Sequence, residues 1–490
     1  MTNEPSARLL RLPFKRPEYF SVPELLISSL AHRAHHRLAD SPPIGHGPDT
    51  SRPTKSVGYM YRADPRQTSA LEVRTTFPQP AELTALGDEL KRRGLESDGP
   101  GSMLAEAVAR SVLGIRLDKT GFQPASPLTP ALALLQDPRG VLVKAGPPDF
   151  ADILESMFAV GAASDDGQDS VTARWMSAAD RRLEVDPILR GIDASIDVAV
   201  LHSAYERRDD LLGLGHEEAR VWAGQFSGTP YSWFNRAWAK LTSDAWVDAL
   251  PARVWVDWAT TVLRLTMGLG FLWEASWYEN LARAVIDRAV PSTFRELVAG
   301  VDEPLPWRSR RAAIGTRDVA SHIKHRISRG EKARNNLIEW IDEYEKDGHD
   351  LSRMTATEFL RRVADEARPR EVLSRAMNSS VVAGKTVHET VKYGLQARQS
   401  SGEFADYYGI LRSHGRRWVL VDPGTEWISV VASLTCPGPS ESCTVGDVLT
   451  DLTALGMRPE IRDLVELLER AGLARGSADA DNAVVVESAF

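Results

Sequence analysis

The sequence predicts a mainly α-helical protein with small β elements and several domains, built around a helical body that is rich in tryptophan. The chain has 490 residues, of which 26% are charged and 43% hydrophobic, and a globular chain of this length usually divides into about three domains. Eight of the 13 tryptophans fall within residues 222–277. Trp255 and Trp258 follow Pro251 at helical spacing, and proline suits the first turn of a helix.

The first part of the chain is expected to mix helices with short strands. Residues 22–38 and 103–113 have the apolar spacing of helices. Residues 71–77 alternate as a half-buried strand does, and residues 140–144 have the composition of a short strand. We therefore assign residues 1–150 to a mixed α/β N-terminal region.

Residues 171–300 are predicted to form a Trp-rich helical domain. An aromatic stripe at helical spacing is typical of a packed core, because a platform that stacks nucleic acid bases needs exposed rings. Polar residues 161–170 and the stretch 301–306 (VDEPLP) are expected to be exposed connections on either side of this domain. Three charged residues are expected to form ion pairs at the edge of the bundle: Asp257, Arg264 and Glu274.

The formal net charge of −8 is distributed unevenly along the chain. Residues 306–417 carry 22 Lys and Arg against 15 Asp and Glu, a net charge of +7, so the remainder of the chain carries −15. A concentrated basic stretch in an acidic protein is the electrostatic footprint expected for a polyanion. A solvated helix face, or a partner for the acidic remainder of the same chain, would have the same composition.

The basic stretch predicts a contact with nucleic acid, and duplex DNA is the expected form. We assign residues 307–435 to a basic helical region that ends in a hairpin, with strand-like runs at 407–411 and 416–421 and cations at the tip. The residues expected to contact nucleic acid are Arg308, Arg310, Arg311, Lys324, Arg326, Arg329, Lys332, Arg334, Arg412, Arg416 and Arg417.

The order of elements at the C-terminal end resembles a winged helix-turn-helix. Residues 357–377 have a helical pattern, and with the cationic hairpin they resemble such a module over residues 357–431. Residues 436–490 resemble a second one, with a capped helix after Thr444, a helix over 458–471 in the position of a recognition helix, and a final strand.

The charge of the second module argues against DNA recognition. Residues 436–490 have 4 Lys and Arg against 10 Asp and Glu, a net charge of −6. A helix that enters a major groove must neutralise phosphates on both sides. We therefore expect residues 436–490 to form an acidic winged-helix-like module that binds a protein partner.

Motifs for catalysis and for cofactor or metal binding are incomplete in this sequence. The stretch 379–386 (SSVVAGKT) ends like a phosphate-binding loop, but it starts with Ser and follows a helical pattern instead of a strand. A histidine group near residue 32 has no Cys or carboxylate to complete a metal site. Asp64, Glu72 and Arg74 loosely resemble the D…E-x-K of restriction-type nucleases, with Arg in place of the Lys. We assign no catalytic residue, no cofactor and no metal.

Several classes of protein are excluded or disfavoured by the composition. No apolar run approaches the ~18 residues of a membrane-spanning helix. The basic N-terminal residues precede no apolar segment of a secretory signal. Cys436 and Cys443, the two cysteines, cannot form a disulfide framework, so a reducing cytoplasm is the expected compartment.

The function expected from these observations is that of a non-enzymatic, DNA-associated accessory protein in a cytoplasmic prokaryotic multi-protein system. A restriction or phage-defence system is the architectural analogy. Two alternatives remain open: a diverged nuclease or other hydrolase centred on the N-terminal region, and a protein scaffold whose basic stretch binds an acidic partner. Salt-dependent duplex binding separates the first function from the scaffold, and metal-dependent cleavage would select the nuclease.

Overall fold

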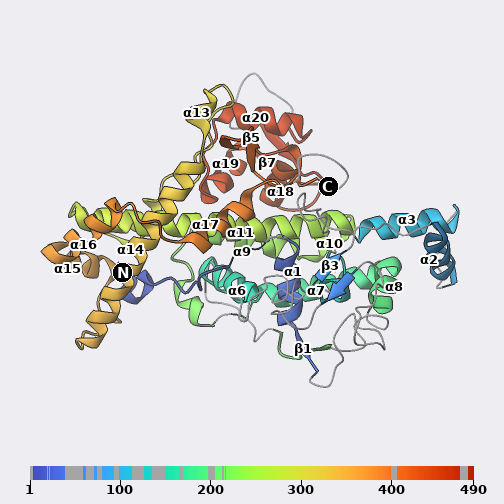
Figure 1. Ribbon diagram of the computed structural model, residues 1–490, viewed down its shortest axis with the longest axis horizontal. Coiled ribbons are helices and arrows are strands. Elements are labelled where there is room, and N and C mark those ends of the chain that lie inside the picture. The colour runs from blue at the N-terminus through green and yellow to red at the C-terminus, as the bar shows by residue number, and fades with distance from the viewer. Residues whose placement is uncertain are drawn as a thin grey trace.

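Figure 1 shows the computed structural model of the chain, in which 63% of the described residues are helical and a few small strand pairs are antiparallel. The structure describes residues 4–18, 20, 23–38, 59–61, 71–73, 80–92, 99–112, 126–134, 149–164, 169–196, 205–211, 215, 217–398, 405–474 and 484–490. The expectation of a mainly α-helical protein with small β elements is confirmed. In the described ranges, no helix has the length and apolar character needed to cross a membrane.

The N-terminal part combines short helices with two of the small sheets. Strand β1 pairs with β4, and β2 pairs with β3, each pair antiparallel. The predicted helix over residues 22–38 ends early, because His35 to Arg37 leave it to pair with β4. The predicted strand at 140–144 lies outside the described residues. The elements are η1 (Ala7–Leu10), α1 (Leu25–Arg33), β1 (His35–Arg37), β2 (Tyr59–Tyr61), β3 (Leu71–Val73), α2 (Pro80–Arg92), α3 (Gly101–Ser111) and α4 (Pro130–Leu134).

The middle of the chain is helical, as predicted, apart from one short strand. Asp149, Ser170 and Thr293 cap helices here by accepting a bond from the backbone of the first turn. The elements are α6 (Phe150–Val160), α7 (Val171–Val185), α8 (Pro187–Ile196), β4 (Tyr205–Arg207), η4 (Glu217–Trp222), α9 (Pro230–Leu241), α10 (Asp244–Ala249), α11 (Ala252–Ile286) and α12 (Phe294–Ala299).

The last part continues with helices, a hairpin and a small terminal unit. The predicted helix over 357–377 is two helices, which meet at Glu366 in an extended conformation. The elements are α13 (Ile314–Arg317), α14 (Ala320–Lys346), α15 (Ala356–Asp365), α16 (Ala367–Asn378), α17 (Lys385–Leu395), β5 (Leu411–His414), β6 (Trp418–Val421), α18 (Thr425–Thr435), β7 (Ser442–Thr444), α19 (Val445–Ala454), α20 (Ile461–Arg470) and β8 (Val485–Glu487).

Helix α11 is the axis of the molecule, and α9, α14 and α17 pack directly against it (Figure 1). Helix α14 crosses α11 at Gly330, where a β-carbon would lie 2.2 Å from the Ala275 carbonyl oxygen. Glycines Gly268 and Gly394 allow a similarly close approach of α11 and α17. Side-chain-free positions are needed here because helix axes can approach closely only where no β-carbon intervenes.

The tryptophans form the core, as the sequence predicts. Trp175 of α7 stacks on Trp255 of α11 with ring centroids 4.3 Å apart. Trp222 is half-buried, and its indole nitrogen donates to the Leu9 carbonyl oxygen. The other seven tryptophans of the predicted stripe are buried: Trp233, Trp238, Trp246, Trp255, Trp258, Trp273 and Trp277.

The charged residues of this region are paired, but they lie deeper than predicted. Arg264 and Asp406 form an ion pair at 2.8 Å with side chains 1% and 0% exposed, and Glu274 is buried against Arg16 at 2.7 Å. The expected position at the bundle edge is therefore wrong for Arg264 and Glu274. The elements that cover α11 come from both ends of the chain and enclose these charges.

One hydrophobic core includes residues from Ala7 to Val486, so the middle and C-terminal parts are packed together. The stretch 301–306 is part of this core instead of an open connection: Val301 and Leu305 are buried, and the Leu305 amide donates to the Gly456 carbonyl oxygen. The expectation of an exposed connection at 301–306 is therefore wrong.

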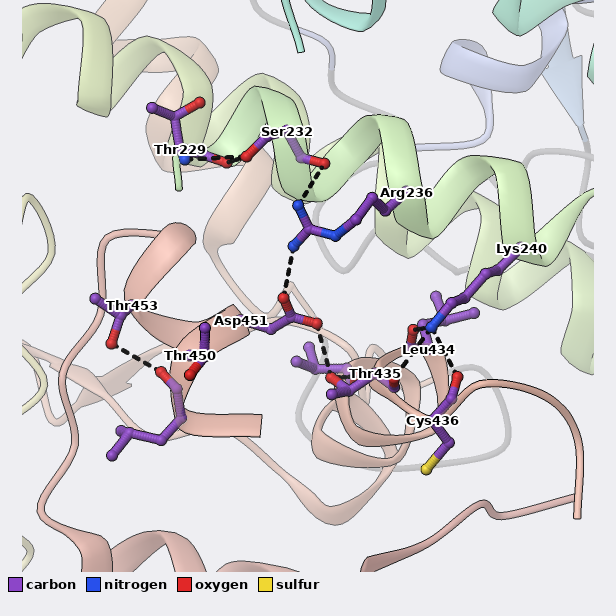
Figure 2. A network of polar contacts seen from close by, with 12 residues as sticks. Thr229, Ser232, Arg236, Lys240, Leu434, Thr435, Cys436, Thr450, Asp451 and Thr453 are labelled. Carbon is purple, nitrogen blue, oxygen red and sulfur yellow. Dashed lines mark hydrogen bonds and ion pairs between the residues drawn. The ribbon is translucent and has the colours of Figure 1, made fainter. Parts of the chain in front are cut away.

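The acidic module at the C-terminal end packs on α9 and α11. Figure 2 shows Arg236 of α9 on Asp451 of α19, and Lys240 of α9 on the carbonyl oxygens at the end of α18. The ring of Phe490 also packs edge-on against Trp258 of α11. The predicted helix start at Thr444 is confirmed, since its hydroxyl and Asp447 form a reciprocal cap.

Candidate nucleic-acid interface

The hairpin lies against the start of the basic stretch, although about 100 residues separate them in the chain. The Val319 amide donates to the Val419 carbonyl oxygen at 2.9 Å, and the Val419 amide donates to the Asp318 carboxylate at 2.8 Å. Asp318 also forms a β-bridge with Leu420. The turn between β5 and β6 is made by residues 415–417, where Gly415 has a φ of 63°, a conformation that favours glycine.

This pairing places the segment around α13 beside the hairpin, and we call the exposed arginines of these two distant segments the α13–hairpin surface. Arg308 and Arg310 come from the segment before α13, and each forms an exposed ion pair, with Glu303 at 2.7 Å and with Asp422 at 2.8 Å respectively. Arg417 lies over the Trp418 ring at 4.7 Å. The α13–hairpin surface consists of Arg308, Arg310, Arg311, Arg416 and Arg417.

The ion pairs on this surface leave the arginines able to bind another anion. Exposed pairs stabilise a protein by about 0–1 kcal/mol, so phosphate oxygens can replace the carboxylates at little cost. The Arg417 guanidinium lies over an indole ring, and this contact restricts its motion without using its hydrogen-bond donors. Arginine forks of this kind match the geometry of phosphate groups.

Two other predicted contacts lie near this surface with different surroundings. Arg412 is in strand β5, not at the hairpin tip, and its Nε donates to the Asp422 carbonyl oxygen at 2.8 Å. The prediction that Arg412 is a tip residue is therefore wrong. Lys324, in the first turns of α14, is exposed. Its charge helps to lower the pKa of His388 on α17, for which burial is the larger cause.

The remaining predicted contacts face inwards, toward carboxylates of α11. Arg326 and Arg329 lie 3.4 and 2.8 Å from Glu279, which is 3% exposed, and Arg334 lies 3.5 Å from Glu274. Burial lowers the pKa of Arg326, although Glu279 opposes this effect. These three arginines are half-buried and balance the charge of the helix crossing. Their expected position on an exposed polar face is wrong.

Lys332 is also engaged within the protein. Its ammonium group donates to the Ser379 carbonyl oxygen at 2.9 Å, which ties α14 to the end of α16. The sequence contains a signal for these inward-facing arginines: Glu274 and Glu279 follow the long apolar run of α11, and carboxylates buried there need cationic partners. Arg326 and Arg329 occupy one flank of α14 at helical spacing, as such partners would.

A hollow of about 490 Å³ lies beside the crossing of α11 and α14. The His322 ring bonds the Pro304 carbonyl oxygen through Nε2 at 3.1 Å, and burial together with the neighbouring Arg326 lowers the pKa of His322. The hollow therefore presents neutral His322 at pH 7, beside three arginines and two carboxylates. Its lining residues are Glu279, Asn280, Arg283, Gly300, Asp302, His322, His325, Arg326 and Arg329.

The motifs rejected in the sequence can be placed in part. The stretch 379–386 follows α16, as predicted, and Gly384 precedes α17. The His35 ring bonds the Ala31 carbonyl oxygen at 2.7 Å. Asp64 and Arg74 lie outside the described residues, as does the side chain of Glu72. Among the residues with described positions, no group of three or more His, Cys, Asp or Glu could hold a metal ion.

Comparison with known proteins adds no relative to this picture. No protein-family model matches the chain, and no curated protein is significantly similar to it. The fold and the surface described above therefore carry the functional argument by themselves.

Proposed function

We propose that this protein binds nucleic acid, with duplex DNA as the expected form, through the α13–hairpin surface. The observation that carries the proposal is the pairing of residues 318–319 with strand β6, which gathers five exposed arginines from two segments in an otherwise acidic protein. A cluster of cations that is assembled by the tertiary structure differs from a charged helix face, because its members are held at fixed positions relative to one another.

Three of the arginines predicted to contact nucleic acid are left out of the proposed interface. Arg326, Arg329 and Arg334 neutralise buried glutamates, so their charges are already balanced within the protein. The residues still expected to contact nucleic acid are therefore those of the α13–hairpin surface and Lys324. A duplex that rests on this area would be held by phosphate contacts, which position a protein on DNA without reading the sequence.

The C-terminal unit supports the second half of the predicted function, a protein contact. Residues 436–490 contain β7, α19, α20 and β8 in that order, with a further β-bridge between Ala474 and Val486. We interpret this order as that of a winged-helix-like module, in which α20 would be the recognition helix. The exposed side of α20 carries both signs of charge, with Arg462, Glu466, Glu469 and Arg470, which suits a protein partner better than phosphates. The placement in a restriction or phage-defence system stays a prediction.

The test is charge reversal on the α13–hairpin surface, in the variant Arg311→Glu, Arg416→Glu and Arg417→Glu. These side chains are exposed, so the fold should survive, as the melting temperature would show. Binding to a fluorescent duplex should weaken across all sequences alike. The slope of log affinity against log salt should fall by up to about 2.7, since each phosphate contact contributes about 0.9.

The matched control reverses three exposed arginines elsewhere, at Arg353, Arg362 and Arg368 around α15 and α16, with the same change in net charge. A general electrostatic effect would weaken binding equally in both variants, whereas a defined interface is sensitive only to the first. The proposal is refuted if the wild-type protein has no affinity for duplex at low salt, or if the two variants bind alike. Binding of an acidic protein without binding of DNA would select the scaffold alternative.

A further inference from the structure

The two cysteines of the chain lie side by side, although six residues separate them in the sequence. Cys436 follows the last turn of α18, and Cys443 is in strand β7. Their sulfur atoms are 3.3 Å apart, and both are free thiols. An S–S bond is about 2.05 Å long, so the two sulfurs need to approach by only about 1 Å to form one. Proximity of this kind is the first requirement for an intramolecular disulfide.

The ammonium group of Lys240 lies close to the two cysteines. The Lys240 ammonium group donates to the carbonyl oxygens of residues 434, 435 and 436 at 2.8, 3.0 and 2.7 Å, and so caps the end of α18 (Figure 2). The hydrogen bond with Cys443 and the charge of Lys240 both lower the pKa of Cys436, while burial opposes them. The hydrogen bond with Cys436, together with burial, raises the pKa of Cys443. Because the thiolate is the attacking form of cysteine, Cys436 is the sulfur suited to attack an oxidised Cys443.

Access to the pair is provided by a second hollow, of about 390 Å³, between α9 and the C-terminal unit. Cys443 and Lys240 line this hollow, together with Thr435, Pro437 and Ser442. Cys436 itself is fully buried behind Cys443. A small oxidant can therefore reach one sulfur directly, and the other sulfur is in place to complete the bond.

We propose that Cys436 and Cys443 are a reversible dithiol–disulfide site, oxidised by a peroxide and reduced by a small thiol. Hydrogen peroxide first oxidises the Cys443 thiol to a sulfenic acid and releases one water. The Cys436 sulfur then attacks the Cys443 sulfur, so that the S–S bond forms and the S–OH bond breaks. The hydroxide that leaves takes the Cys436 proton and becomes the second water. Two electrons pass from the two sulfurs to the peroxide, and two equivalents of thiol reverse the change.

Oxidation would join the end of α18 to β7, in the unit that packs on α9. Cys443 is the register partner of Val486 in β8, so the bond would also fix the small terminal sheet to α18. The loop between the cysteines contains Ser440, whose φ of 60° is unusual for a residue with a side chain. This inference does not depend on nucleic acid binding, and the two can fail separately.

The test uses the 490-residue protein and needs no variant. Mild hydrogen peroxide should remove both titratable thiols and lower the intact mass by two hydrogen atoms, and dithiothreitol should restore both. Glu441 lies between the cysteines, so cleavage after glutamate should yield two fragments that remain linked until reduction. Thiols that stay titratable in the folded protein, or that become sulfinic acids without a link, would overturn the proposal.

Two variants separate the geometry from general thiol chemistry. In Cys443→Ser, peroxide should add oxygen to Cys436 slowly or not at all, and no loss of two hydrogens should occur. In Lys240→Gln, the disulfide should still form, but severalfold more slowly at neutral pH, because the thiolate loses its cation. Cleavage and mass analysis of the wild-type protein in urea provides the reference rate without the folded geometry. An equal rate of linkage in folded and unfolded protein would contradict the inference.

Discussion

The buried ion pair between Arg264 and Asp406 allows a test of how much a paired charge in the core contributes to the stability of the fold. Arg264 of α11 reaches Asp406 with both terminal nitrogens, at 2.8 and 3.0 Å. It also donates to the carbonyl oxygens of Gly394 and Gln396 at 2.8 and 3.0 Å. The change Asp406→Asn keeps the shape of the side chain and removes the negative charge. It leaves the Arg264 guanidinium buried without a charged partner of its own.

The expected loss of stability follows from the burial of both partners. Their side chains are 1% and 0% exposed, and removal of one partner from a fully buried pair typically costs about 3–5 kcal/mol. Unfolding entropy of about 2.1 cal/mol/K per residue amounts to about 1 kcal/mol/K for 490 residues that unfold together. The melting temperature of Asp406→Asn should therefore fall by about 3–5 °C.

Differential scanning calorimetry of the wild-type and variant proteins measures this shift, and pH provides an internal control. Burial alone would raise the pKa of Asp406, but the Arg264 guanidinium keeps this pKa below its ordinary value of 3.8. The contribution of the ion pair is therefore present above pH 3.8 and is lost as the pH falls through the lower pKa of the folded state. The two melting temperatures should converge in that acidic range.

A double variant, Arg264→Met with Asp406→Leu, tests whether the cost arises from the uncompensated charge. Replacing both partners should cost clearly less than the sum of the two single changes, since no charge is then buried. The reasoning is refuted if Asp406→Asn melts within about 1 °C of the wild-type protein at pH 7. Simple additivity of the two single changes would refute it equally.

The remaining predictions concern the crossing of α11 and α14. The variant Arg326→Gln with Arg329→Gln should lose about 1–3 kcal/mol in calorimetry, because Glu279 is 3% exposed and would lose two of its ion-pair partners. Stability equal to the wild-type protein would show that these arginines are dispensable for the fold. Gly330→Val should destabilise the protein by more than about 1 kcal/mol in urea titration, since its β-carbon would overlap the backbone of α11, and an unchanged midpoint would contradict the close crossing.

Local patterns in the sequence were sufficient for the helical class, the tryptophan core and the elements α19, α20 and β8 near the C-terminal end. Helical spacing of apolar residues, and caps such as Thr444 with Asp447, involve neighbours within a few positions of the chain. The same holds for the glycine at 456, whose φ of 84° follows the end of α19 as its position predicts. These features depend on backbone geometry over one or two turns, and the surrounding residues therefore determine them.

The tertiary structure alone decided which cations are free for a ligand. Arg326 and Arg311 belong to the same basic stretch, yet the first is paired with Glu279 of α11 and the second is exposed. The choice depends on which face of α14 packs on α11, and that face is selected by Gly330 at the crossing. Counting charges along the sequence cannot distinguish a paired arginine from an exposed one, because the count does not say where the opposite charge lies in the folded protein.

Long-range packing also decides which charged groups meet when they are far apart in the sequence. Arg264 and Asp406 are 142 positions apart, and Lys240 reaches the end of α18 from almost 200 positions away. Their pairing is determined by long-range packing of helices on α11, which buries each charge beside its partner. The sequence by itself determined which residues carry charge and which segments are helical, and the packing determined which charges meet, because burial makes an unpaired charge too costly to keep.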